Sequence, residues 1–343
     1  MKEVVLGSTG IQVVQNGFGA LPIQRVSMEV AVNILRKAYE GRMRFFDTAR
    51  AYSDSEEKLG EALQVYSRES YFIATKTMAT TPDEFWKQLQ QSLTLLKTDY
   101  IDIYQFHCAS QVYKPHDGTG MYECMLEAKK QGKIKHIGIT THQLQVALDA
   151  VDSKLYETIQ FPFSYLSSDK ELALVQKSQK ANMGFIAMKG LAGGLINQSK
   201  PAMAYMCQFD NVLPIWGIQK ESELDEWLSY MQNTPVLNDE MKAFIEKEKE
   251  ELSGDFCRGC GYCMPCPVGI MINQCARMSL MLRRAPSKSW LTPEMQEEMK
   301  KIENCLHCGQ CSRKCPYELD TPALLQKNYE DYQKVLSGEV KVQ

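Results

Sequence analysis

The sequence predicts an α/β protein: a (β/α)8 TIM barrel followed by a smaller, mainly helical domain. Two observations carry this prediction. Over roughly the first 230 residues, short apolar runs alternate with amphipathic stretches, as in a chain that builds a strand and a helix in turn. Beyond them, a charged stretch leads into a segment rich in cysteine, which marks the expected domain boundary.

The strands of the barrel are expected where the apolar runs end. These ends lie near residues 19, 46, 75, 106, 140, 160, 188 and 217, with amphipathic stretches at 28–40, 83–96, 122–131, 170–180 and 221–231 between them. Eight strand–helix units in about 220 residues are typical of a (β/α)8 barrel. A doubly wound sheet would need a glycine-rich phosphate turn after its first strand, and residues 16–19, NGFG, match that turn poorly.

The second domain is expected to be helical. A charged helix at 238–252, which contains EKEKEEL, closes the first domain, so that the barrel covers 1–252. The second domain then covers 253–343, with helices at 271–284, 293–303 and 323–336. The boundary is placed here because Gly254 and the cysteine-rich segment follow the charged helix directly.

Composition excludes several classes of protein. The chain has 343 residues, of which 44% are hydrophobic and 24% are charged, as in ordinary globular proteins. Its net charge of −3 gives no basic footprint for a nucleic acid. The first residues, MKEVVLGSTG, contain no apolar signal stretch, and no segment is long and apolar enough to span a membrane. We therefore expect a cytoplasmic protein with neither a membrane nor a nucleic acid as partner.

Eight of the twelve cysteines form two runs near the C-terminus, and each run ends in Cys-Pro. The first run comprises Cys257, Cys260, Cys263 and Cys266, and the second comprises Cys305, Cys308, Cys311 and Cys315. The spacing C-x2-C-x2-C-x3-C-P of the second run is the bacterial pattern that holds a [4Fe-4S] cluster, and the first run is one residue shorter before its last cysteine. The eight cysteines are therefore predicted to bind two such clusters.

Disulfides and zinc are the alternatives for these runs. Disulfides are rare in the cytoplasm. Zinc sites usually take two separate Cys-x-x-Cys pairs, which match an unbroken series at three-residue steps less well. The other four cysteines, Cys108, Cys124, Cys207 and Cys275, are scattered, and we interpret them as small buried apolar residues.

Four ionisable residues are predicted at one end of the barrel. Asp47 ends the second strand and Tyr52 follows it, while Lys76 and His107 stand at the ends of the third and fourth strands. Each alone is more often structural, as a helix cap, a surface phenol, a lysine with its head in solvent or a buried histidine. Four of them on successive strand ends indicate catalysis, because barrel enzymes carry their chemistry at the C-terminal ends of strands.

Together these residues suit carbonyl reduction. Hydride transfer to a carbonyl leaves an alkoxide that needs a proton. A free tyrosine has a pKa near 10, and lowering it by about three units requires roughly 4 kcal/mol, which a nearby ammonium can supply. We therefore expect Lys76, oriented by Asp47, to lower the pKa of Tyr52. Tyr52 would then act as the general acid in reduction and the base in alcohol oxidation, and His107 would direct the substrate oxygen.

These residues also carry a family resemblance. The series Asp47-Thr48-Ala49, Tyr52, Ser55-Glu56, Leu59-Gly60, Thr75-Lys76, 99–107 and Gly132-Lys133-Ile134 resembles the aldo-keto reductase signature over residues 1–230. With its cysteine runs, the whole chain resembles the anaerobe-type aldo-keto reductases that are fused to a C-terminal ferredoxin domain, here of the helical, two-cluster type. The resemblance implies the catalytic roles given above, with NAD(H) or NADP(H) as cofactor.

The resemblance also implies a set of cofactor contacts. They are, in chain order, Thr140, Thr141, Gln160, Met188, Gly190, Gly217, Lys220 and Ser222. The first three would hold the nicotinamide carboxamide, and the next two would line the path of the pyrophosphate. The last three lie in a turn whose backbone N–H groups would face the adenosine phosphate, where Lys220 and Ser222 would favour NADP(H).

The chain departs from the family pattern at three positions. Gly190 and Trp216 replace common prolines, and Trp227 replaces an asparagine that binds adenine in many relatives. The leading hypothesis is an oxidoreductase that interconverts a carbonyl and an alcohol with NAD(P)(H), with two [4Fe-4S] clusters for electron transfer or structure. The alternative, which the departures favour, is an electron-transfer protein whose barrel binds a partner or a different cofactor and does not use the four residues.

The cysteine runs raise two further expectations. In two-cluster ferredoxins the fourth cysteine of each run serves the other cluster, which predicts the sets Cys257, Cys260, Cys263, Cys315 and Cys305, Cys308, Cys311, Cys266. Nicotinamide moves two electrons as hydride whereas a cluster moves one, and a flavin normally mediates between them, but the sequence shows no convincing flavin motif. The ferredoxin domain is expected either to exchange electrons with a redox protein partner or to serve as structure. The basic residues Arg277, Arg283, Arg284 and Lys288 would either dock an acidic partner of this kind or form a solvated helix face.

Overall fold

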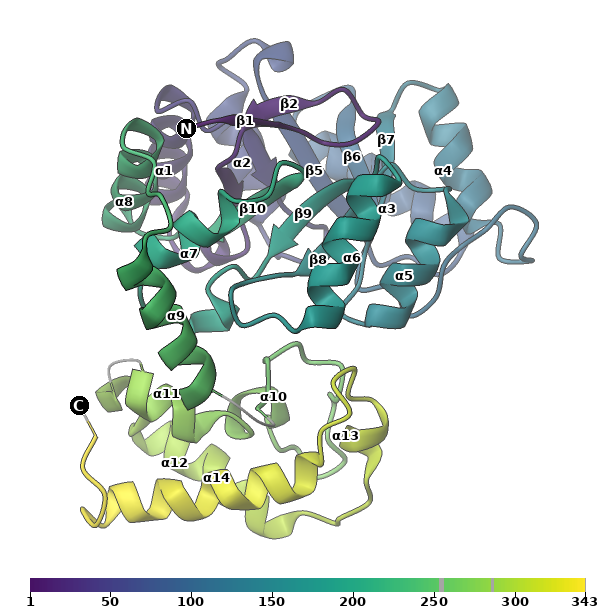
Figure 1. Cartoon of the computed structure of the whole chain (residues 1–343). Helices are drawn as coiled ribbons and strands as arrows, with labels where there is room; N and C mark the ends of the chain where they lie inside the picture. The colour runs from purple at the N-terminus through teal and green to yellow at the C-terminus, as the bar shows by residue number, and fades with distance from the viewer. Residues whose placement is uncertain (253–255, 285–286, 343) are drawn as a thin grey trace. The chain divides into compact units, whose positions relative to one another are not determined.

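The computed structural model describes residues 1–252, 256–284 and 287–342 (Figure 1). The chain divides into two compact units, Met1–Gly190 with Lys200–Asn238, and Leu191–Ser199 with Asp239–Gln343. This division differs from the predicted boundary at residue 252 in two places. Both the charged helix α9 (Asp239–Glu251) and the short segment 191–199, which follows strand β9, belong to the second unit.

The first unit contains a closed barrel of eight parallel strands, as predicted. They are β3 (Gly17–Gly19), β4 (Phe45–Asp47), β5 (Phe72–Thr77), β6 (Ile101–Phe106), β7 (Ile134–Thr140), β8 (Thr158–Pro162), β9 (Gly184–Met188) and β10 (Val212–Gly217). Each pairs with the next along the chain, and β10 closes onto β3 with Trp216 opposite Phe18. The predicted strand ends agree with the observed ends to within two residues. The (β/α)8 prediction is confirmed.

Helices follow the strands of the barrel (Figure 1). They are α1 (Met28–Glu40), α2 (Ser55–Leu63), α3 (Pro82–Leu95), α4 (Met121–Lys130), α5 (Leu144–Ser153), α6 (Asp169–Lys180), α7 (Ser199–Met206) and α8 (Glu221–Gln232). Local sequence fixes where several of them begin. Ser27 caps α1 by accepting the N–H of Val30 at 3.3 Å, and Ser168 and Glu171 form a capping box at the start of α6.

An N-terminal hairpin of β1 (Glu3–Val5) and β2 (Gln12–Val14) closes one end of the barrel. Its apolar side chains share one buried cluster with residues of five barrel strands; the members are Val4, Leu6, Ile11, Val13, Phe45, Ala74, Ile103, Ile186, Leu213 and Ile215. Gly7 forms a bridge to Met183, directly before β9. The hairpin therefore lies where the strands begin, and the site is left to the end where they finish.

The second unit is helical, as expected. The predicted helix at 271–284 is two short helices, α10 (Ile272–Cys275) and α11 (Met278–Arg284). They are followed by α12 (Pro293–Lys300), α13 (Gln310–Arg313) and the long helix α14 (Thr321–Leu336), with 3-10 turns at Ser287–Trp290 and Lys301–Asn304. Its buried core includes Leu195, Ile270, Ile272, Met278, Leu282, Met299 and Tyr332. Leu195 brings the 191–199 segment into this core.

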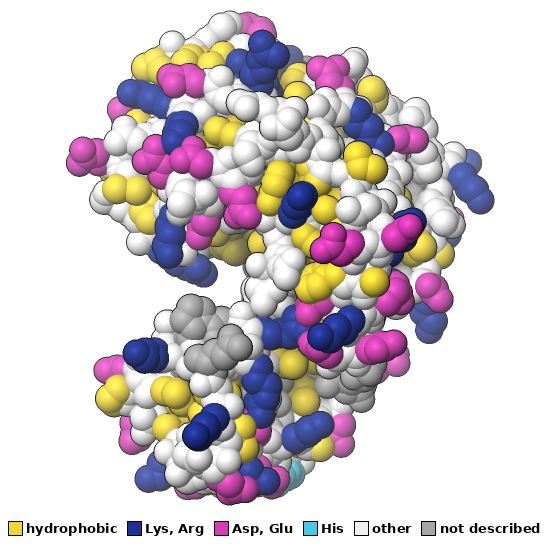
Figure 2. All heavy atoms as spheres, turned by 60° about the vertical axis from the view of Figure 1, so that its left-hand side comes forward, with side chains coloured by type: hydrophobic (Ala, Val, Ile, Leu, Met, Phe, Trp, Pro, Cys, Tyr) yellow, Lys and Arg dark blue, Asp and Glu magenta, His cyan; other side chains and the backbone are white. Residues whose placement is uncertain are grey.

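Two general features agree with the sequence. Acidic and basic side chains are interspersed over the barrel surface in Figure 2, in line with the small net charge. Among the described helices, none combines the length and the apolar character that crossing a membrane requires.

Candidate active site

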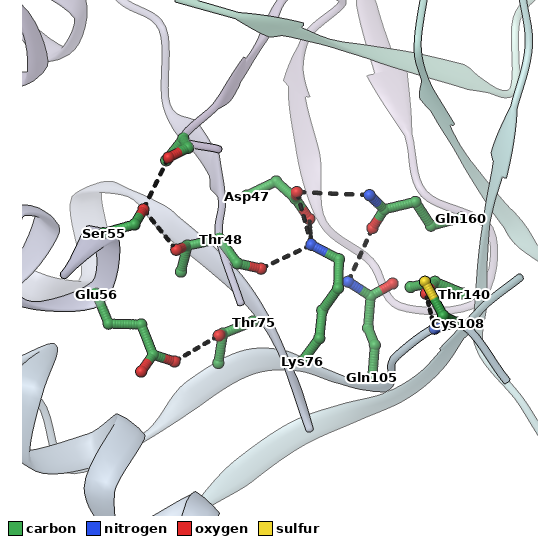
Figure 3. Close-up of polar contacts among 11 residues, drawn as sticks. Asp47, Thr48, Ser55, Glu56, Thr75, Lys76, Gln105, Cys108, Thr140 and Gln160 are labelled. Carbon is green, nitrogen blue, oxygen red and sulfur yellow. Dashed lines mark hydrogen bonds and ion pairs between the residues drawn. The ribbon is translucent and has the colours of Figure 1, made fainter. Parts of the chain in front are cut away.

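A buried ion pair between Asp47 and Lys76 lies at the centre of the candidate site. Asp47 is the last residue of β4, and Lys76 lies near the end of the neighbouring strand β5. The Lys76 Nζ donates to both carboxylate oxygens of Asp47, at 2.8 and 2.7 Å, and to the carbonyl oxygen of Thr48 at 2.6 Å (Figure 3). An ammonium has three N–H donors, so these bonds use all of them.

Tyr52 and His107 lie beside this pair. Tyr52 is in the turn after β4, where its N–H donates to the carbonyl oxygen of Ala49 at 3.0 Å, and His107 follows β6 directly. The two ring centroids are 5.5 Å apart, with the ring planes at 80°. Lys76 Nζ lies 5.2 Å from the centroid of the Tyr52 ring. The structure thus brings together the four residues that the sequence placed at strand ends.

The proton affinity of Tyr52 differs from the expectation. Burial raises the pKa of Tyr52 well above its usual value, and the negative charge of Asp47 adds to the rise. Lys76 does not lower it, because the ammonium is paired with Asp47 and its N–H groups are all bonded elsewhere. The expectation that Lys76 lowers the pKa of Tyr52 is therefore wrong for this structure, and Tyr52 keeps its proton.

His107 is neutral in this environment. Burial lowers the pKa of His107 to about 3, and the positive charge of Lys76 contributes. The Nδ1 atom of His107 is buried and has no hydrogen-bond partner within the described ranges. A neutral imidazole has one donor and one acceptor nitrogen. A proton on Nε2 is the tautomer that avoids an unpaired buried donor at Nδ1.

Two buried glutamines extend the polar network away from Asp47. Gln160 Nε2 donates to Asp47 Oδ2 at 3.4 Å, and Gln160 Oε1 accepts from Gln105 Nε2 at 3.0 Å (Figure 3). Gln160 was predicted as a nicotinamide contact, and it lies against the ion pair. Gln105 was missed, although a signal exists: it is a fully buried polar residue in the otherwise largely apolar stretch IDIYQF.

The turn that carries Tyr52 is held by buried hydroxyl and carboxyl groups. Thr48 Oγ1 and Ser55 Oγ share a hydrogen bond of 2.8 Å across this turn. Glu56, in the first turn of α2, accepts from Thr75 Oγ1 at 2.6 Å (Figure 3). Burial raises the pKa of Glu56. These residues come from the stretch that carries the family resemblance, and they fix the position from which Tyr52 reaches the site.

The hydroxyl groups of Thr140 and Thr141 are engaged with backbone. Thr140 Oγ1 accepts the N–H of Cys108 at 2.8 Å, and Thr141 Oγ1 donates to the carbonyl oxygen of Ala109 at 2.8 Å. Both bonds fasten the start of the loop after β6 to the end of β7. This arrangement gives the two threonines a structural function in addition to the predicted nicotinamide contact.

The turn between β10 and α8 already contains a carboxylate. Glu223 accepts the backbone N–H groups of Gln219 and Lys220, at 2.9 and 3.1 Å. These are N–H groups of the turn that was expected to face the adenosine phosphate. Gly217 ends β10, and Lys220 and Ser222 are exposed at the start of α8.

The three departures from the family pattern form one packing arrangement near the end of β9. Met188 ends this strand, two residues before Gly190. A Cβ atom on Gly190 would lie only 2.5 Å from Cζ3 of Trp216. Trp216 stacks on Trp227 with ring centroids 4.0 Å apart and planes at 10°, and both indoles are almost fully buried. The absence of a side chain at Gly190 makes room for the tryptophan pair.

The predicted ligand cysteines line two neighbouring cavities in the second unit. One is lined by Cys257, Cys260, Cys263 and Cys315, and the other by Cys263, Cys266, Cys305, Cys308 and Cys311. Each cavity therefore takes cysteines from both runs, which agrees with the exchange of the fourth cysteine. Cys263 borders both cavities, so the two sites adjoin.

These thiols fit clusters better than single metal ions. Over the described ranges, no three or more His, Cys, Asp or Glu side chains converge on one metal-ion position. Thiols spread around a cavity suit the separated corners of an iron–sulfur cluster, whereas zinc needs four converging ligands. Burial, with the nearby thiols of Cys257 and Cys260, raises the pKa of Cys263 to about 12, so binding must displace thiol protons.

The basic cluster of the second unit forms intramolecular bonds. Arg283 makes a bidentate pair with Asp331, at 2.6 and 2.7 Å. Arg284 pairs with Glu248 at 2.6 Å, and Arg277 donates to the carbonyl oxygen of Gly193 at 2.9 Å. Arg277 and Arg284 are therefore partly buried and bonded within the unit, which corrects both alternatives for these two residues, whereas Arg283 remains exposed beside Asp331.

Comparisons with known sequences agree with this geometry. The model of the aldo/keto reductase family matches residues 13–212, and that of a 4Fe-4S dicluster domain matches residues 256–320. L-galactose dehydrogenase from Arabidopsis thaliana is 29% identical over 216 residues, 57% of this chain and 67% of that protein. Methylglyoxal reductase DkgA from Escherichia coli O157:H7 is 35% identical over 134 residues, 38% of this chain and 48% of that protein. The chain thus spans from about half to two thirds of these relatives.

Solved structures give the same fold. Aldo-keto reductase AKR11C1 from Bacillus halodurans, in its holo form, matches with a TM-score of 0.64 at 22% identity, over 72% of this chain and 96% of that one. At this identity the likeness shows the fold alone. The family match, in contrast, covers more than half of this chain and includes Asp47, Tyr52, Lys76 and His107. This protein is therefore an oxidoreductase of the aldo/keto reductase family that carries a C-terminal 4Fe-4S dicluster domain.

Proposed function

We propose that the barrel reduces a carbonyl compound to an alcohol with NAD(P)H. The observation that supports this proposal is the convergence of Tyr52, His107 and the Asp47–Lys76 pair where the barrel strands end. Barrel enzymes carry their chemistry at this end. The nicotinamide cofactor supplies the hydride, and the protein has to polarise the carbonyl and deliver a proton.

Tyr52 is the proton donor in this proposal. Its pKa is raised by burial, so its hydroxyl stays protonated at all physiological pH values. A weak acid suffices here, because the alkoxide formed by hydride transfer is about as basic as hydroxide and is therefore a far stronger base than a phenolate. The same raised pKa leaves little Tyr52 phenolate at neutral pH, so alcohol oxidation, which needs this base, would be slow there.

His107 orients the carbonyl oxygen in this proposal. Its pKa of about 3 keeps the imidazole neutral, so it donates one hydrogen bond from Nε2 without adding charge. Lys76 contributes a positive field that Asp47 partly balances, and it holds the β4 and β5 strand ends in register. The reacting oxygen would lie within reach of Tyr52 and His107 together.

Several residues would hold the cofactor. Gln160 is the best placed of the predicted contacts, because its amide lies against Asp47. Thr140, Thr141, Met188 and Gly190 would line the nicotinamide and pyrophosphate part of the path. The turn that contains Gly217, Lys220 and Ser222 would meet the adenosine phosphate, with the two exposed polar residues favouring NADP(H).

The C-terminal unit would exchange single electrons through two [4Fe-4S] clusters. The cavity linings support the ligand sets Cys257, Cys260, Cys263, Cys315 and Cys266, Cys305, Cys308, Cys311. A redox protein partner would deliver or accept these electrons, because a cluster carries one electron at a time.

Substitution of Tyr52 by phenylalanine tests the proposal. Methylglyoxal, after which the relative DkgA is named, is a first carbonyl to assay with NADPH and NADH. Loss of a positioned proton donor typically costs 10²–10⁴-fold, so kcat should fall by about that factor in Tyr52→Phe. Tyr66→Phe, at a partly buried tyrosine whose hydroxyl donates to Glu40 Oε1, is a matched control. Unchanged turnover in Tyr52→Phe on every active substrate would exclude the mechanism.

The second candidate function is electron transfer without use of the four residues. The Trp216–Trp227 stack and the Glu223 carboxylate at the start of α8 favour it, because both alter the part of the barrel that would meet adenosine phosphate. Calorimetry with NADPH separates the two candidates. Tight binding supports the reductase, and no binding supports the alternative. Anaerobic mixing with NADPH, followed by visible and EPR spectra, then shows whether the clusters become reduced.

A further inference from the structure

The guanidinium of Arg277 lies between two glycines of the second unit. Arg277 Nη1 donates to the carbonyl oxygen of Gly193 at 2.9 Å. A Cβ atom on Gly193 would lie 2.9 Å from Arg277 Nη1, and one on Gly259 would lie 3.1 Å from Nη1 and 3.2 Å from Cζ. Both glycines also have a positive φ, at 67° and 63°. Neither position would accept a side chain without displacing the arginine.

Gly259 connects Arg277 to one of the predicted cluster sites. Gly259 lies between Cys257 and Cys260, and its N–H donates to the Sγ atom of Cys257 at 3.3 Å. The guanidinium therefore lies against the turn that presents these two cysteines.

The Nε–H of Arg277 is a buried donor. The Nε atom is buried and makes no hydrogen bond within the described part of the chain. An unpaired buried donor costs about 1–3 kcal/mol, and more when the group is charged. A sulfur of the adjoining cluster site would accept this N–H, because cysteines that bind a cluster are thiolates and the cluster adds sulfides of its own.

We propose that Arg277 is a positioning residue for the cluster held by Cys257, Cys260, Cys263 and Cys315. Its Nε–H donates to a sulfur of that site, while its Nη1 holds the backbone of the 191–199 segment. The inference rests on the clusters of the proposed function. No covalent bond changes in this arrangement: one electron enters the cluster from a reductant, and the arginine responds to the added negative charge.

The arrangement has a consequence at the 191–199 segment. This segment is continuous in sequence with Gly190, one of the predicted cofactor contacts, and leads into α7. Reduction of the cluster strengthens the attraction of Arg277 to the sulfur site and polarises its bond to Gly193 O. The oxidation state of this cluster therefore changes the strength of the hydrogen bond between Arg277 and the backbone that follows β9.

Redox potentiometry on the holoprotein tests the first half of the proposal. Iron and sulfide analysis first establishes that two clusters are present. A protein without clusters is then not mistaken for a failure of this inference. Arg277→Gln should lower the midpoint potential of one cluster and leave the other unchanged. A tenfold change in the reduction equilibrium is expected, which is 59 mV for one electron. Arg277→Lys, which keeps the charge but loses the planar donor, should shift the potential by less.

Arg283→Gln is the matched control, because Arg283 pairs with Asp331 and makes no contact with the cysteine turns among its described bonds. Its two potentials should equal those of the unmodified protein. If Arg277→Gln does not retain its clusters, Arg277→Lys supplies the measurement. Potentials that are unchanged in every Arg277 variant that retains both clusters would overturn the proposal.

Hydrogen exchange tests the second half. Peptides that cover residues 191–199 should exchange more slowly in the dithionite-reduced protein than in the oxidised protein. This dependence on oxidation state should be lost in Arg277→Gln and retained in Arg283→Gln. Equal exchange in the two oxidation states of the unmodified protein would contradict the connection between the cluster and this segment.

Discussion

Lys76 Nζ lies 5.2 Å from the centroid of the Tyr52 ring, yet all three of its N–H groups are bonded to Asp47 and Thr48. The lysine therefore acts on the tyrosine through its field and not through a hydrogen bond. Asp47 balances that field, and burial controls the proton of Tyr52. The ion pair therefore fixes the geometry of the site and leaves Tyr52 a neutral, protonated acid. The expected pH dependence consequently differs from that of a site in which the lysine ionises the tyrosine.

Removal of one member of the ion pair should destabilise the barrel strongly. In Asp47→Asn the Lys76 ammonium stays buried, at 1% exposure, without its counter-charge. Breaking a buried pair in this way costs about 3–5 kcal/mol. Urea denaturation followed by tryptophan fluorescence measures the loss. The double variant Asp47→Leu/Lys76→Met removes both charges and should lose less stability than Asp47→Asn. An equal or larger loss in the double variant would contradict this account.

Carbonyl reduction should show no inflection in kcat between pH 6 and pH 10. The pKa of Tyr52 is raised well above its usual value, so the acid stays protonated throughout this range. Alcohol oxidation needs the deprotonated phenol, so its rate should rise with pH across the same range without reaching a plateau. Initial rates in both directions provide the measurement. A fall in the reduction rate with an apparent pKa near 7 would show that Tyr52 is more acidic than its surroundings imply.

His107 should make the protein lose stability as the pH falls below about 6.5. Its folded pKa of about 3 lies below the unfolded value, so between these values only the unfolded chain binds the proton. The stability contributed by the neutral ring is fully present above pH 6.5 and is lost progressively toward pH 3. At pH 5 the loss amounts to about 2 kcal/mol. Urea midpoints at pH 7 and pH 5 should differ less in His107→Gln, and an identical difference would exclude His107 as the cause.

A side chain at Gly190 should conflict with Trp216. Gly190→Ala places a methyl group 2.5 Å from Cζ3 of the indole, and overpacking of this kind typically costs about 1–3 kcal/mol. Trp216→Phe removes those outer ring atoms, so the double variant Gly190→Ala/Trp216→Phe should recover part of the loss. Denaturation midpoints of the two single variants and the double variant form the cycle. Simple additivity would show that the two residues are not coupled.

Local sequence patterns were sufficient for the barrel and for the four residues at its mouth. The strand ends follow from apolar runs, and Asp47, Lys76 and His107 stand at or beside those ends. Features that depend on distant partners were not predictable in this way. Arg283 pairs with Asp331, which lies 48 residues later in the sequence. The space that a side chain at Gly190 would occupy is filled by Trp216 from another strand. Burial raises the pKa of Tyr52, whereas the sequence predicted a lowered pKa. No sequence pattern predicts how deeply a single side chain is buried.

Cys266 provides the sharpest test of the ligand sets. It closes the shortened first run, yet it lines the cavity that contains Cys305, Cys308 and Cys311. Cys266→Ser should therefore lower the content to about one cluster per chain and remove the signal of the cluster that the second run holds. Iron and sulfide analysis with EPR of the reduced protein provides the measurement. Cys207→Ser, in the barrel, is the control and should retain both clusters. Two intact clusters in Cys266→Ser would refute the exchange of the fourth cysteine, because the cluster of the second run would then not need the Cys266 thiolate.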